Sequence, residues 1–157
     1  MRFYIIFFLA ALIISPGTYA QQFGGNPTSI QWRQLNTDTA RVIFPKGMDS
    51  VANRVASVVH FMAGRQPFSL GKQQRKINIV LQHQTVVANG YVGLGPYRSE
   101  FFLTPEMNGL GQGSIPWADQ LAVHEYRHVQ QINNFNNGLS RFMRVIAGEQ
   151  GYDLAIN

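Results

Sequence analysis

The chain has 157 residues, with 13 Lys and Arg against eight Asp and Glu, a formal net charge of +5 and no cysteine. This length supports one domain with its own core, and the lack of cysteine excludes disulfides, a lipid-modified cysteine and thiolate metal ligands. The densest basic cluster, Lys72, Arg75 and Lys76, is too short for a phosphate-binding run, so no nucleic-acid partner is expected.

The first twenty residues, "MRFYIIFFLAALIISPGTYA", predict a secretory signal peptide. Arg2 precedes an apolar run of about a dozen residues, which is shorter than the roughly 20 that a spanning helix needs. Thr18 and Ala20 supply small residues at the cleavage positions. We therefore expect an exported protein, periplasmic or secreted, that is cleaved after Ala20 and keeps no stable membrane span.

The rest of the chain predicts an α+β fold in which a mixed β-sheet packs against helices. Residues 21–29 are polar and contain Gly and Pro, which indicates a flexible start. Two strands are expected within 30–45. A helix is expected over 49–64, because valines recur there at helical spacing, and a core strand over 76–84.

The following stretch predicts a loop or hairpin turn at Asn89-Gly90 and a second strand near 100–104. A further helix should open with Ser114 as its N-cap and run to about Asn134. A last helix is expected from about Ser140. The predicted order is therefore strand, strand, helix, strand, strand, helix, helix.

The helix that opens near Ser114 contains "LAVHEYRHVQQ", with a His-Glu-x-x-His motif from His124 to His128. Residues four apart share one helix face, so the two histidines can point at one ion. Glu125 can reach a water on that ion and take its proton during attack on a carbonyl, which is the chemistry of zinc hydrolases. The alternative is a surface helix that matches the pattern by accident.

The segment "VHEYRH" resembles the active-site motif of zincin metalloproteases, in the gluzincin or peptidase-MA-like group. The preceding strand-helix-strand-strand order is similar to the N-terminal half of their catalytic domain. The resemblance implies a zincin-like metallopeptidase domain over 30–157, truncated at its C-terminus. It implies Zn²⁺ ligation by His124 and His128, with Glu125 as general base. It also implies a peptide or protein substrate that pairs with a sheet edge near Phe101–Leu103.

The same resemblance implies a third zinc ligand, usually a glutamate on a following helix. Glu149 stands at nearly the family's spacing, and Asp153 could support a motif histidine from behind. Relatives often carry this glutamate in a Trp-x-x-Glu-Gly-x-Ala context, whereas "IAGEQGYDLAIN" has no tryptophan. The third ligand is therefore either Glu149 or a residue beyond Asn157.

Two functions remain open at this point. One is an exported zinc metallopeptidase, and the other is a non-catalytic or truncated zincin-fold module that binds a partner. A complete set of zinc ligands would distinguish the enzyme from the binding module.

Overall fold

The computed structural model describes residues 26–65, 71–104, 115–135, 138–143, 145–146 and 148. The predicted signal peptide lies outside these residues. The strands are β1 (Trp32–Asn36), β2 (Ala40–Pro45), β3 (Ile77–Gln82), β4 (Ala88–Leu94) and β5 (Tyr97–Leu103), and the long helices are α2 (Asp49–Gly64) and α3 (Trp117–Phe135). Residues 138–143 are also helical. The predicted α+β class is confirmed.

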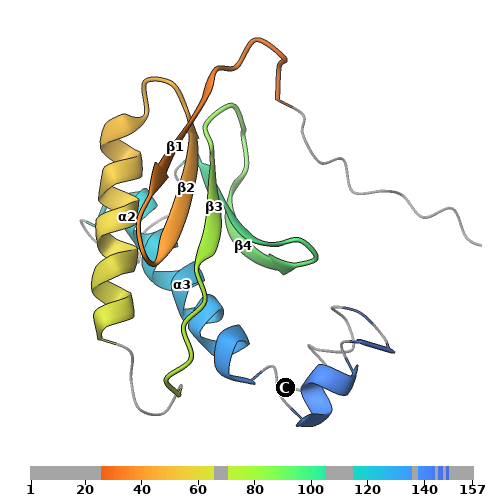
Figure 1. Cartoon of the computed structure of the whole chain (residues 1–157). Helices are drawn as coiled ribbons and strands as arrows, with labels where there is room; N and C mark the ends of the chain where they lie inside the picture. Colours follow the sequence, from red (N-terminus) through yellow and green to blue (C-terminus); the bar gives the residue numbers. More distant parts are fainter. Residues whose placement is uncertain are drawn as a thin grey trace, which may run out of the picture.

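The five strands form one mixed sheet in the order β1-β2-β3-β5-β4 (Figure 1). The three central strands, β2, β3 and β5, run parallel to one another. The two outer strands, β1 and β4, pair antiparallel with their neighbours. β4 is therefore an edge strand of the described sheet.

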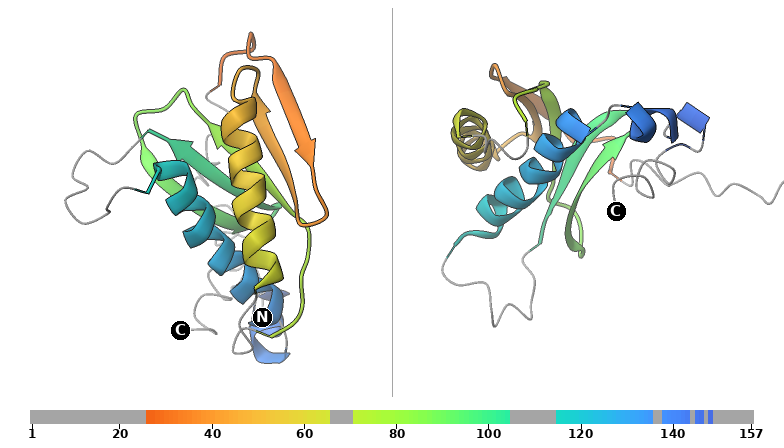
Figure 2. Two further views of the ribbon diagram at one scale, coloured as in Figure 1. Left: turned by 90° about the vertical axis from the view of Figure 1, so that its left-hand side faces the viewer. Right: turned by 90° about the horizontal axis from the view of Figure 1, so that it is seen from below.

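Both long helices cover the same face of this sheet and lie side by side (Figure 2). Val55 and Val59 of the predicted apolar stripe are buried in α2, together with the alanines Ala52, Ala56 and Ala63. In β3, every second residue is buried beneath the helices, as expected for a strand with one covered face. Among the residues that the structure describes, no helix combines the length and apolarity needed to cross a membrane.

Two expectations about the sheet were wrong. Asn89 and Gly90 do not form a turn; they lie inside β4, and the chain reverses at Gly95-Pro96 instead. The local preference of Asn-Gly for turns yields here to the pairing of β4 along the whole length of β5. Likewise, Phe101–Leu103 is not a sheet edge, because β5 pairs with β3 on one side and β4 on the other.

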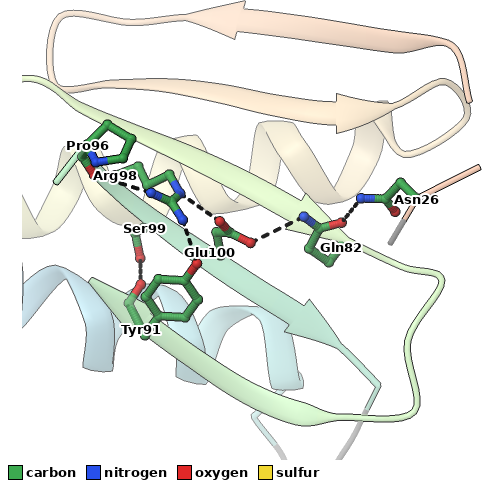
Figure 3. Close-up of polar contacts among 7 residues, drawn as sticks. All are labelled: Asn26, Gln82, Tyr91, Pro96, Arg98, Ser99 and Glu100. Carbon is green, nitrogen blue, oxygen red and sulfur yellow. Dashed lines mark hydrogen bonds and ion pairs between the residues drawn. The ribbon is translucent and has the colours of Figure 1, made fainter. Parts of the chain in front are cut away.

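A chain of polar side chains crosses the face of the sheet that the helices leave open (Figure 3). Asn26 Nδ2 donates to Gln82 Oε1 at 2.9 Å, and Gln82 Nε2 donates to Glu100 at 3.3 Å. Arg98 donates to Glu100 at 2.6 Å and to the Tyr91 hydroxyl at 2.9 Å. This network joins β3, β5 and β4 and fastens the segment before β1 to the sheet.

Candidate functional site

The first turn of α3 is fixed by contacts with two other elements. The Pro116 carbonyl accepts the first helical hydrogen bonds, from Asp119 N at 2.9 Å and Gln120 N at 3.1 Å. Trp117 Nε1 donates to the Phe102 carbonyl of β5 at 2.9 Å. Arg54 of α2 binds the buried Asp119 carboxylate. The predicted N-cap, Ser114, lies outside the described residues.

The second half of α3 is fixed by amide side chains. Gln130 is buried and donates to the Met62 carbonyl at the end of α2, at 3.2 Å. The Tyr97 hydroxyl of β5 donates to Asn133 at 2.8 Å. Asn134 bonds both the N–H and the carbonyl of Gln73 in the α2–β3 connection. The His-Glu-x-x-His motif therefore lies in the middle of a helix that is held on both sides.

The two motif histidines face each other, as their spacing predicts. Their Nε2 atoms lie 3.3 Å apart, and both side chains are exposed. Two Zn–N bonds of about 2.0–2.1 Å at a tetrahedral angle would place the nitrogens about 3.3–3.4 Å apart. The ring pair therefore has the spacing that one tetrahedral ion requires.

His128 also has a partner at its second nitrogen. Its Nδ1 lies 3.1 Å from Gln131 Oε1 on the same helix. An amide oxygen accepts the Nδ1–H, and this tautomer leaves the Nε2 lone pair available for a metal. The donor set therefore fits a zinc ion on two counts, the separation of the nitrogens and the tautomer.

Glu125 differs from its histidine neighbours because it is buried, with 3% of its surface exposed. Within the described residues, its carboxylate accepts no hydrogen bond and forms no ion pair. Burial raises the pKa of Glu125, while the charges of His124 and His128 act in the opposite direction. A buried carboxylate without a partner is uncommon in a folded protein, and such groups occur often at functional sites.

A cleft of about 970 Å³ opens between α3 and the edge strand β4. His124, Glu125 and His128 line it from α3, and Gly90 and Val92 line it from β4. The edge strand thus runs along the same cleft as the motif. A ligand in this cleft can reach the histidine pair and the carboxylate together.

The structure does not test the prediction of a third zinc ligand. Glu149 and Asp153 both lie outside the described residues, so their placement stays a prediction. Within the described residues, no three His, Asp or Glu side chains come together as a metal site. Two other acidic groups with little exposure already have partners, since Asp119 binds Arg54 and Glu100 binds Arg98.

Tyrosine hydroxyls are among the groups that can stabilise an oxyanion during hydrolysis. The Tyr91 hydroxyl belongs to the polar network on the helix-free face, and burial raises its pKa to about 12. The Tyr97 hydroxyl is held by Asn133. Both groups are therefore structural in this fold.

Sequence reasoning missed two residues that shape the site. Gly90 was interpreted as part of a turn, yet it lies directly against the Glu125 carboxylate. The residues that follow it, Tyr91 and Val92, are strand formers, and they were the available sign of a strand there. Arg54 was not singled out at all, and no local pattern connects it with Asp119, which is 65 residues away.

Comparison of the chain with protein-family models, with curated proteins and with solved structures finds no match.

Proposed function

We propose that this chain is an exported, zinc-dependent metallopeptidase of the zincin type. The observation that carries the proposal is the combination of His124 Nε2 and His128 Nε2 at 3.3 Å with the buried carboxylate of Glu125, which has no partner among the described residues, in the same cleft. Two imidazoles and an adjacent carboxylate on one helix can supply two metal ligands and the general base of metal-assisted hydrolysis. In this proposal the third protein ligand is Glu149, with Asp153 supporting a motif histidine.

A zinc ion held by these residues would lower the pKa of a coordinated water towards about 7. Glu125 acts as the general base in the proposal and accepts the proton of the water that attacks the peptide carbonyl. The same carboxylic acid then returns the proton to the departing amine. Burial suits this role, because it raises the proton affinity of the Glu125 carboxylate.

The substrate in this proposal is a peptide in extended conformation, lying along β4. β4 is an edge strand of the described sheet and forms one wall of the cleft. An extended peptide can add to such an edge through main-chain hydrogen bonds. This replaces the expectation that Phe101–Leu103 would receive the substrate, since that segment already has strands on both sides.

Substitution of Glu125 tests the proposal. The Glu125→Ala variant should retain zinc like the parent but hydrolyse a mixed peptide pool at least about 1,000-fold more slowly, since the general base is lost. His128→Ala should lose both zinc and hydrolysis. Parental cleavage rates in Glu125→Ala would contradict the role of Glu125.

A further inference from the structure

The closest approach between β4 and the motif occurs at Gly90. A Cβ atom placed on Gly90 would lie 2.7 Å from Glu125 Oε1, and 3.0 Å from both Cδ and Cγ of the same side chain. Non-bonded carbon contacts are normally about 3.5–4.0 Å. The Glu125 carboxylate therefore occupies the space that any side chain at position 90 would fill.

The need for glycine at position 90 comes from space and not from backbone conformation. Gly90 is absent from the described glycines with positive φ, so its backbone is open to other residues. Its place in β4 is fixed by pairing with Phe101 of β5, and its N–H donates to Asn89 Oδ1 at 2.8 Å. If a side chain is added there, the carboxylate of Glu125 is the group that must move.

We propose that Gly90 is a positioning residue, which sets the place of the Glu125 carboxylate in the cleft. This inference rests on the proposed function in taking Glu125 as the general base. A carboxylate pushed away from β4 would no longer lie where the attacking water is held. Displacement of a catalytic group by about 1 Å can reduce the rate about 100-fold.

Gly93 offers a matched control in the same strand. A Cβ atom placed there would meet its nearest neighbour, Tyr91, at 3.6 Å, which is an ordinary contact. Gly93 pairs with Arg98, so its side chain would lie on the face of the sheet opposite the helices. Gly90→Ala and Gly93→Ala thus add the same methyl group to β4, and only the first meets Glu125.

The first measurement compares steady-state kinetics and zinc content of these two variants of the full chain. Gly90→Ala should lower kcat at least about tenfold, with zinc content and KM close to those of the parent. Gly93→Ala should stay within about twofold of the parent. Adding Glu125→Asp, which shortens the acid by one methylene, should cost less activity in the Gly90→Ala background than in the parent.

The second measurement does not depend on activity. Melting temperatures of the zinc-free proteins are compared for the parent, Gly90→Ala, Glu125→Ala and the double variant. The change in melting temperature caused by Gly90→Ala should be more favourable in the Glu125→Ala background than in the parent, by about 2 °C or more. The same cycle with Gly93→Ala should show no coupling.

The outcomes separate the two proposals. Equal kcat for Gly90→Ala and Gly93→Ala, or a thermal cycle without coupling, would overturn the role of Gly90. If the zinc-loaded parent hydrolyses nothing, the proposed function fails. In that event the thermal cycle alone decides whether Gly90 determines the position of the Glu125 side chain.

Discussion

Arg54 of α2 forms a bidentate ion pair with the carboxylate of Asp119 at the start of α3. Its Nε and Nη2 atoms donate to both carboxylate oxygens at 2.8 to 3.1 Å. The Asp119 side chain is 7% exposed, whereas that of Arg54 is 66% exposed. This bidentate contact joins residues far apart in the chain and fixes the first turn of the motif helix against α2.

Removal of the Arg54 guanidinium should therefore destabilise the fold. We expect Arg54→Met to lower the melting temperature by about 3 °C or more, because it leaves the buried Asp119 carboxylate without its partner. Arg33→Met is the matched control, since the Arg33–Asp49 pair is about half exposed on both sides. Exposed ion pairs contribute little to the free energy of unfolding. Equal decreases in melting temperature in the two variants would contradict the stabilising role of Arg54.

The Gln131 contact with His128 makes a separate prediction about metal affinity. Gln131→Leu removes the acceptor that lies 3.1 Å from His128 Nδ1. Loss of such a partner typically weakens metal binding about 10–100-fold, because the imidazole loses its orientation and tautomer. Zinc affinity can be measured by competition with a chromogenic chelator.

Gln120→Leu provides the control for that measurement. Gln120 lines the same cleft from the same helix but donates to the Ile115 carbonyl and not to a histidine. Its substitution should leave zinc affinity within about threefold of the parent. If Gln131→Leu binds zinc as tightly as Gln120→Leu, the tautomer argument is wrong.

The Arg98–Glu100 pair should make the stability of the fold depend on pH. Burial alone would raise the pKa of Glu100, but hydrogen bonds from Tyr91, Arg98 and Gln82 together hold the pKa below its ordinary value. A lowered pKa means that the charged form stabilises the fold. That contribution is complete above the unfolded pKa of about 4.3 and is lost as the pH falls through the folded value.

Glu100→Gln should therefore melt below the parent at pH 7, by about 3 °C or more. The melting temperatures of the two proteins should approach each other as the pH falls below the unfolded pKa of about 4.3 and through the lowered folded pKa, where the parent carboxylate becomes protonated as well. Melting curves of both proteins between pH 3 and 8 provide the comparison. A difference that stays constant over this range would show that the charge of Glu100 contributes nothing.

Local patterns in the sequence predicted the elements that are built from local contacts. The valine spacing predicted the helix over 49–64, and α2 runs from Asp49 to Gly64. The i, i+4 rule predicted that His124 and His128 would face each other, and their nitrogens are 3.3 Å apart. In both cases the relevant neighbours lie within one or two helical turns.

The features that the sequence did not reveal depend on contacts between distant segments. The order of β4 and β5 in the sheet is fixed by pairing, and the Asn-Gly dipeptide at 89–90 pointed to the wrong turn. The burial of Glu125 requires a residue without a side chain on the facing strand. No periodicity within α3 contains that information.

The most direct test of the central claim is the zinc content of the purified protein after dialysis against a weak chelator. The proposal predicts about one zinc per chain, lost in His128→Ala but kept in His60→Ala, whose imidazole lies exposed on α2. A folded parent that retains no zinc, or a His128→Ala variant that retains as much as the parent, would contradict the assignment of this motif as a metal centre.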